Sequence, residues 1–207
     1  MDWSNPILFH GDLNEEAFRT FENAQSLAVD TETLGLIERR DRLCLVQLSD
    51  EVGRIALVKI NPAMEPVLLK TLLEDSRILK IFHFARFDMR FIWEHLGSMP
   101  GPVYCTKIAS KIARTASGGH GLKDLTKALL GFELPKEEGT SDWGGDLYSP
   151  AQLEYAANDV RYLHQLKDRL ESLLTREDRE HLAHRSFDYL PTLVELDHFG
   201  WENVLEH

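Results

Sequence analysis

The order of apolar and polar positions predicts alternating strands and helices in the first half of the chain. Buried strands are expected where short apolar runs are bounded by polar or turn residues, at 26–32, 43–50, 54–60 and 78–84. The turn-rich gap from Asp50 to Gly53 predicts an antiparallel pairing of the two runs that flank it. Helical spacing of apolar residues predicts helices at 14–24, 63–74 and 85–96. This alternation predicts an α/β fold in which helices flank a mixed sheet.

The second half of the chain has a helical pattern from Thr106 onward, interrupted by loops at 115–121 and 134–150. The second loop ends in a helix start, with Ser149 as N-cap, Pro150 at the first helical position and Gln152 completing a capping box. Apolar residues at helical spacing predict that this helix packs on the sheet. For 175–207 we expect one further helix and a short arm, whose final Leu-Glu-His resembles the remnant of an expression tag.

Composition indicates a globular protein. The 207 residues, 43% hydrophobic and 28% charged, suffice for one substantial core, so we expect a single domain over 1–207. No apolar run is long enough to cross a bilayer, and the N-terminus lacks the features of a secretory signal, which predicts a cytoplasmic protein without a membrane partner. Cys44 and Cys105 both lie in apolar stretches, and we expect two buried thiols rather than a disulfide.

The net charge of −11 argues against an extended grip on a long polyanion, which normally takes many contacts from Lys and Arg to phosphate. Two explanations would reconcile this charge with a nucleic-acid substrate. The substrate is too short to need a basic track, or bound metal ions supply positive charge locally. Both can hold together.

Candidate chemistry begins with Asp30 and Glu32, two carboxylates at the end of the apolar run 26–32. Because side chains alternate along a strand, the two point to the same side. Such a pair repels and has raised pKa values unless a cation lies between its members. The alternative is that a strand end merely exposes acidic residues.

Three further residues add to this pair. Asp88 lies one turn into the helix predicted at 85–96, where an acidic side chain also favours the helix N-terminus. Tyr155 and Asp159 are four residues apart on the capped helix and therefore share one face. Each of these observations taken alone is common in proteins without an active site.

Taken together, the five residues resemble the three exonuclease motifs of the DEDD superfamily. The segments LAVDTETLGL, FHFARFDMRF, LEYAANDVRYL and LPKEEGTSDWG are similar to those of ribonuclease D and its relatives, over roughly residues 26 to 170. The position five residues before Asp159 is Glu154 rather than histidine, which indicates the tyrosine branch, DEDDy. The short chain and the sequence Leu34-Gly35-Leu36 after the first motif resemble the nanoRNase C group most.

The resemblance implies a ribonuclease H-like fold with a mixed five-stranded sheet that holds two Mg²⁺ or Mn²⁺ ions. Oxygen ligands from four carboxylates suit these metals. By the resemblance, Asp30 bridges both ions, while Glu32 and Asp159 hold the ion that activates water. Asp88 holds the second ion through water, and Tyr155 orients or deprotonates the nucleophile. The nine histidines show no spacing typical of a zinc site.

Substrate contacts are predicted less directly. Leu36 matches the position where dinucleotide-cleaving relatives wedge an apolar side chain between bases, the alternative being a core leucine. His83 is a candidate for a 5′ phosphate, and Thr31, Leu34 and Arg86 complete the predicted set. Other candidates for phosphate contacts, each with a surface or packing alternative, are Arg39, Arg40, Arg42, Lys111, His120 and Lys123.

The predicted activity is two-metal 3′→5′ hydrolysis of short oligoribonucleotides, dinucleotides above all, to nucleoside 5′-monophosphates. Three alternatives stay open: trimming of tRNA or structured RNA 3′ ends as by ribonuclease D, 3′→5′ cleavage of single-stranded DNA, and a binding module without catalysis. Because metals bind the scissile phosphate rather than the sugar, the motifs do not separate RNA from DNA. The resemblance also implies a homo-oligomer based on dimers, with an octameric ring as one arrangement.

Overall fold

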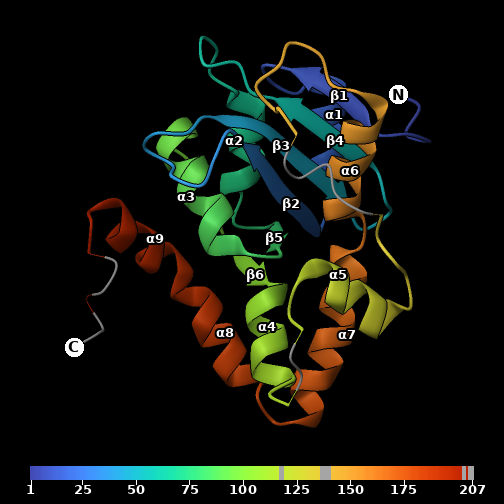
Figure 1. Ribbon diagram of the computed structural model, residues 1–207, viewed down its shortest axis with the longest axis vertical. Helices are drawn as coiled ribbons and strands as arrows, with labels where there is room; N and C mark the ends of the chain where they lie inside the picture. The colour runs from blue at the N-terminus through green and yellow to red at the C-terminus, as the bar shows by residue number, and fades with distance from the viewer. Residues whose placement is uncertain (117–118, 136–140, 202–203, 205–207) are drawn as a thin grey trace.

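The structure, a computed structural model, describes residues 1–116, 119–135, 141–201 and 204. Its described residues form a mixed sheet of six strands in the order β1-β4-β3-β2-β5-β6 (Figure 1). The antiparallel pairs are β2 with β3 and β3 with β4, whereas β1–β4, β2–β5 and β5–β6 are parallel. The strands are β1 (Ile7–His10), β2 (Ser26–Thr33), β3 (Leu43–Asp50), β4 (Ile55–Lys59), β5 (Leu79–Phe82) and β6 (Val103–Cys105).

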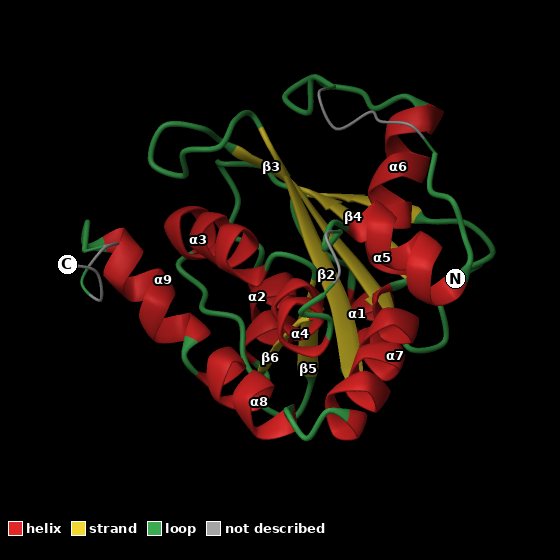
Figure 2. Cartoon of the chain, turned by 60° about the horizontal axis from the view of Figure 1, so that its bottom comes forward, coloured by secondary structure: helices red, strands yellow, loops and turns green. Residues whose placement is uncertain are grey.

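Helices cover both faces of this sheet. They are α1 (Glu15–Phe21), α2 (Val67–Glu74), α3 (Ala85–Leu96), α4 (Thr106–Ala113), α5 (Leu122–Leu125), the π-helix η1 (Thr126–Leu130), α6 (Pro150–Arg161), α7 (Leu163–Arg176), α8 (Glu180–Asp188) and α9 (Leu190–His198). Figure 2 shows α6 and α3 on opposite sides of the sheet, with α8 and α9 lying outside the layer that contains α3 and α4. The core is one continuous apolar cluster, because β3 is buried along its whole length and α6 packs on β2, β3 and β4.

The pairing of β2 creates an opening in the sheet. On one side β2 pairs with β3 from Leu27 to Thr33, with a register shift between Glu32 and Thr33. On the other side it pairs with β5 only from Ser26 to Ala28, because β5 ends at Phe82 and the chain turns into α3. The second half of β2 therefore has a free edge facing the start of α3, where side chains from both faces of the sheet can meet.

The predicted mixed sheet flanked by helices is confirmed, but the predicted number of five strands is wrong. The sequence pattern does not predict β1 and β6, because they have only four and three residues, too few to show a regular alternation of apolar and polar positions. The helix starting at Ser149 has its predicted capping box, yet it divides into α6 and α7 at Tyr162, whose φ of −107° departs from helical geometry.

Where the structure describes it, the region 175–207 contains two helices beyond α7 rather than the one expected. Tyr189 separates α8 from α9, and Pro191 lies in the first turn of α9, where a proline fits a new helix but not the interior of a continuing one. The final Leu-Glu-His, and parts of the loops at 115–121 and 134–150, lie outside the described residues.

Two further expectations concern the compartment of the protein. Cys44 and Cys105 are free and buried, which confirms the expected thiols. Among the described helices none has the length and apolar character required to cross a membrane. A cytoplasmic location stays a prediction.

Candidate active site

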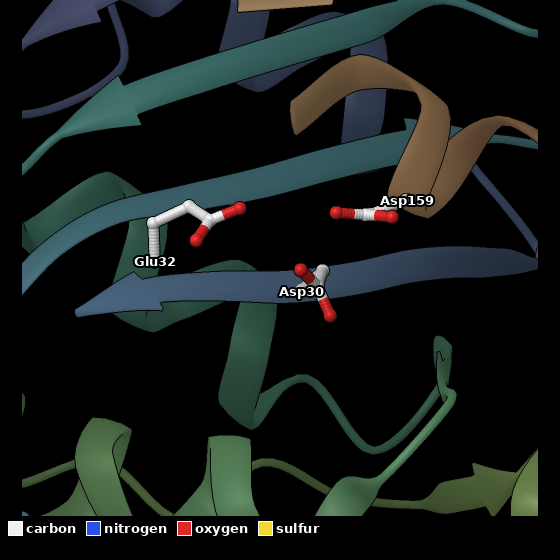
Figure 3. Close-up of side chains that lie close together, drawn as sticks. All are labelled: Asp30, Glu32 and Asp159. Atoms are coloured by element: carbon white, nitrogen blue, oxygen red, sulfur yellow. The ribbon is translucent and has the colours of Figure 1, made fainter. Parts of the chain in front are cut away.

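Three carboxylates come together on one face of the sheet. Asp30 and Glu32 project from β2, and Asp159 faces them from α6 (Figure 3). One carboxylate oxygen from each of the three residues lies within 4.8 Å of the others. Asp30 and Asp159 keep some exposed surface, so a solute can reach the group from solvent. An all-oxygen cluster of this kind offers the ligands that Mg²⁺ and Mn²⁺ prefer.

Small residues of α6 bring Asp159 to the sheet. The helix begins at a capping box formed by Ser149 and Gln152, which fixes its direction. Ala156 and Ala157 are fully buried, and their short side chains allow the helix backbone to approach β2, β3 and β4 closely. Asp159 then faces the end of β2. Tyr155, one turn earlier on α6, lines the same cavity as Asp30, Glu32 and Asp159.

Asp88 reaches this cavity from the other side of the sheet. Thr31 points away from its neighbours on β2, and its Oγ1 donates a hydrogen bond of 2.7 Å to Asp88 Oδ1. Asp88 is not one of the three residues whose oxygens cluster, although it lines the same cavity of about 230 Å³. The oxygens of Asp88 therefore lie farther from this cluster than the oxygens of Asp30, Glu32 and Asp159 lie from one another.

The acidic residues of the cavity have strongly raised pKa values. Burial is the main cause at all four, and repulsion from neighbouring carboxylates adds to it at Asp30, Glu32 and Asp88. The pKa of Glu32 is raised to about 9, those of Asp88 and Asp159 to about 7, and that of Asp30 well above its usual value. In the protein alone the cavity thus retains protons that a divalent cation would displace.

Tyr155 completes the set with a phenol that keeps its proton. Burial raises its pKa above the usual value, and the negative charges of Asp159, Glu32 and Asp30 raise it further. The phenol also shares a hydrogen bond with Asp159. Of the two predicted roles, this environment favours orienting a water molecule over taking a proton from it.

A second cavity of about 360 Å³ adjoins the acidic one and shares Thr31, Glu32 and Phe87 with it. Its remaining wall includes Leu34 and Leu36 from the segment after β2. Leu36 is 78% exposed, so the alternative of a core leucine is wrong. Two exposed apolar side chains thus lie at the edge of an acidic pocket, an arrangement suited to contact with a base.

The remaining predicted contacts have different surroundings. His83 lines the acidic cavity with Nδ1 at 2.9 Å from Thr106 Oγ1, and burial lowers its pKa to about 4, so the ring is neutral at physiological pH. Arg86 instead binds Asp197 through two hydrogen bonds of 2.7 and 2.6 Å. Its predicted substrate contact stays a prediction.

The other basic candidates lie around the site rather than in it. Arg40 pairs with Asp41, and Arg42 donates to the carbonyl of Gly144. His120 Nδ1 lies 2.8 Å from Ser110 Oγ, and Lys123 is close enough for its charge to lower the pKa of Asp159. None of these side chains lines either cavity.

Comparison with known proteins places this geometry in a family. A family model described as a 3′–5′ exonuclease matches residues 7–175. The chain belongs to the 3′→5′ exonuclease family. Brucella melitensis NrnC is 44% identical to this exonuclease, with a TM-score of 0.89 and 95% of each chain covered. The predicted membership of the ribonuclease D-like DEDD exonucleases, close to nanoRNase C, and the ribonuclease H-like fold are confirmed.

The curated relatives of this exonuclease are longer proteins. Ribonuclease D of Xanthomonas oryzae pv. oryzae is 34% identical over 179 residues, which are 86% of this chain and 49% of that protein. DNA polymerase I of Aquifex aeolicus is 35% identical over 168 residues, 80% of this chain and 27% of that protein. The exonuclease therefore spans between about a quarter and a half of the length of these relatives.

Three residues that lie at the site of this exonuclease are not among those predicted from the sequence. Gln47 of β3 is fully buried and directs Nε2 toward Glu32 Oε1 at 3.5 Å. The sequence does contain a signal for Gln47, because a single amide side chain inside the apolar strand LCLVQLSD needs a buried polar partner. Phe84 and Phe87 line the acidic cavity, and Phe84 is 48% exposed with Lys107 Nζ 4.2 Å from its ring centroid. They resemble ordinary core aromatics in the sequence, because exposure depends on where β5 ends.

Proposed function

We propose that this exonuclease is a metal-dependent 3′→5′ exoribonuclease that hydrolyses short oligoribonucleotides, dinucleotides above all, to nucleoside 5′-monophosphates. The observation that carries the proposal is the meeting of four carboxylates and a phenol at one cavity, with free leucines beside it. NrnC supports it, because that protein has structures bound to pGG and with bound Mg²⁺.

Asp30, Glu32 and Asp159 would hold one divalent ion, and Asp30 with Asp88 would hold a second. The fit rests on the oxygen cluster and on the raised carboxyl pKa values, which show that negative charge at these residues is disfavoured in the protein alone. When bound, such ions supply positive charge to the phosphate and a more acidic water. Thr31 and Gln47 orient Asp88 and Glu32 through their hydrogen bonds.

Protein groups would then align the reaction. The Tyr155 phenol keeps its proton and donates it to Asp159 in a hydrogen bond, so its oxygen is free to accept a hydrogen bond from the attacking water and to hold that water in line with phosphorus. The P–O bond to the 3′ oxygen breaks as the bond from water forms, and the proton that the water loses is balanced by the one that the 3′ oxygen gains. The products are a nucleoside 5′-monophosphate and a 3′-hydroxyl on the remaining nucleotide. Leu34 and Leu36 contact the bases, and the neutral His83 ring offers a hydrogen bond to the 5′ side of the substrate.

A length series tests the proposed substrate. We expect kcat/KM to be highest for 5′-phosphorylated dinucleotides and to fall by about tenfold or more for RNAs of about twenty nucleotides, because the acidic protein gives long chains little attraction. The measurement is single-turnover and steady-state cleavage of 5′-labelled RNAs with Mg²⁺ or Mn²⁺. Equal or faster cleavage of the long RNAs would contradict the dinucleotide preference and favour ribonuclease D-like trimming.

A DNA substrate is the second candidate, favoured by the 35% identity to DNA polymerase I of Aquifex aeolicus. The acidic cluster contacts phosphate and gives no reason to prefer ribose. The same length series made with deoxynucleotides decides between the two. Higher kcat/KM for the deoxy series would replace RNA by DNA in the proposal and leave the chemistry unchanged.

We also propose that the exonuclease forms a homo-oligomer based on dimers. Several large apolar side chains stand exposed on its surface, among them Phe199 and Trp201, at 62% and 59% exposure. Burying them against a second copy would remove apolar area from water. Light scattering coupled to size-exclusion chromatography should give a mass of two or more chains. A monomeric mass at micromolar concentration would contradict this prediction.

A further inference from the structure

The segment between β2 and β3, residues 34–42, is not held in place by apolar burial. Leu34, Leu36 and Ile37 are 46%, 78% and 48% exposed. Yet Leu34 and Leu36 form a wall of the cavity beside the acidic cluster, so their positions decide the shape of that cavity. Other forces must fix this segment.

Polar contacts from α3 hold the segment. Glu38 is buried between the exposed residues Ile37 and Arg39, and it accepts hydrogen bonds of 2.6 and 2.8 Å from Arg90 Nη2. His95 Nε2 lies 3.0 Å from the carbonyl oxygen of Glu38 and 2.9 Å from that of Asp41. Since Asp88 is also on α3, one helix positions both a carboxylate of the site and the wall of the neighbouring cavity.

Asp197 of α9 extends this network. It is 2% exposed, binds Arg86 through both of its oxygens, and places Oδ2 3.8 Å from Arg90 Nε. The four side chains thus alternate in charge in the order Arg86, Asp197, Arg90 and Glu38, with Asp197 between the two arginines. Figure 1 shows α9 on the far side of the molecule from α6, and α9 packs against α3. α9 lies beyond residue 175, where the match to the exonuclease family model ends.

We propose that Asp197 and Glu38 are positioning residues for the substrate: together with Arg86 and Arg90 they fix residues 34–42 so that Leu34 and Leu36 fit against a second base. This inference rests on the proposed function for its substrate. The network acts on the cavity wall and leaves the carboxylates of β2 and α6 in place. Its loss should therefore weaken binding of a two-base substrate more than it slows the chemistry.

The central test is Asp197→Asn, which keeps the size of the side chain and removes its charge. For a 5′-phosphorylated dinucleotide we expect KM to rise about tenfold with kcat within about twofold. The p-nitrophenyl ester of a nucleoside 5′-monophosphate has only one base, and its kcat/KM should stay within about twofold. Amide hydrogen exchange in residues 34–42 should become faster. In Asp197→Glu, which keeps the charge, KM for the dinucleotide should return most of the way to the wild-type value.

Glu94→Gln is the matched control. Glu94 is also on α3 and faces His198 of α9, with Oε2 3.3 Å from Nδ1, but none of its described contacts reaches residues 34–42. Glu94→Gln should leave kcat and KM for both substrates unchanged, and it should not alter the rate of amide hydrogen exchange in residues 34–42. Glu38→Gln removes the charge of the network member that lies within residues 34–42, on the far side of Arg90 from Asp197, and it does not alter α9. It should reproduce the effects of Asp197→Asn and provides the test if that variant fails to fold.

The outcomes separate the two proposals. If the wild-type protein does not cleave dinucleotides, the proposed substrate is wrong, and hydrogen exchange alone decides whether the network fixes residues 34–42. If Asp197→Asn and Glu38→Gln leave exchange in this segment unchanged, the inference is overturned. An equal loss on both substrates would also overturn it, because it would indicate damage to the acidic cluster rather than to the cavity wall.

Discussion

Replacing Asp30 with asparagine is expected to abolish nearly all activity, with a loss in kcat of about 1,000-fold or more, or ~4 kcal/mol of transition-state stabilisation. Asp30 is the carboxylate that faces both Glu32 and Asp159 in the oxygen cluster and Asp88 across the cavity. An amide keeps its shape but removes the charge that a shared cation needs. Steady-state cleavage of the preferred short RNA measures the effect.

The same variant should be more stable than the wild type in the absence of metal. Burial raises the pKa of Asp30, so the folded state resists the deprotonation that the unfolded chain undergoes freely, and asparagine removes that cost. At about pH 8 in EDTA we expect Tm to rise by at least about 2 °C. Asp188→Asn, an exposed change on α8, serves as control and should alter neither activity nor Tm. A variant with reduced activity and reduced Tm would indicate a structural role for Asp30 instead.

Tyr155→Phe gives a useful comparison in these assays. It removes a hydroxyl that positions water but leaves the carboxylates in place, so its loss should be smaller, about 100-fold. Variants of Asp30 and Tyr155 with equal losses would indicate that the two groups act as one unit.

The local parts of the site could be predicted from the sequence. The same-side geometry of Asp30 and Glu32 follows from strand periodicity, and the shared face of Tyr155 and Asp159 follows from helix periodicity together with the capping box at Ser149. That these two elements and Asp88 meet at one cavity came from resemblance to a family. No local rule brings residues more than 100 positions apart into contact. Their catalytic roles stay a prediction that the substitutions above will test.

Long-range partners and exposure could not be predicted. Arg86 is predicted as a substrate contact, but its partner Asp197 is 111 residues away on a helix that the apolar pattern did not separate from its neighbour. The exposure of Leu36 and Phe84 depends on where β5 stops pairing with β2. Such properties belong to the tertiary arrangement, because periodicity reports only which face of an element is apolar.

Removing divalent metal should make stability strongly dependent on pH. Glu32, Asp88 and Asp159 have folded-state pKa values of about 9, 7 and 7, all above the ordinary values near 4 that apply when the chain is unfolded. The folded protein therefore binds more protons than the unfolded chain, and stability falls as pH rises. The slope is on the order of 1 kcal/mol per pH unit for each retained proton. In EDTA we expect Tm to drop by several degrees between about pH 6.5 and about pH 8.

This pH window isolates the carboxylates from other buried groups. Burial lowers the pKa of His83 to about 4 and also lowers that of His164. The folded protein therefore keeps both rings neutral, and they reduce its stability only as pH falls below about 6.5, where the histidines of the unfolded chain gain protons. Burial lowers the pKa of Lys80 to about 8, so over most of the window this lysine is protonated in the folded and the unfolded protein, and its partial deprotonation near pH 8 opposes the slope by about half a proton at most. The slope in the window therefore reports mainly on the acidic cavity.

Adding Mg²⁺ or Mn²⁺ should remove this slope. A divalent ion binds the deprotonated carboxylates, so its affinity and the stabilisation it gives increase with pH. At about one hundred times Kd the ion contributes ~2.7 kcal/mol, which corresponds to a Tm gain of about 5–10 °C. Differential scanning calorimetry in EDTA, in divalent salt and in NaCl of equal ionic strength separates this binding from screening. A Tm gain that is the same at both ends of the window, or that NaCl reproduces, would show that the carboxylates of the cavity do not bind the ion.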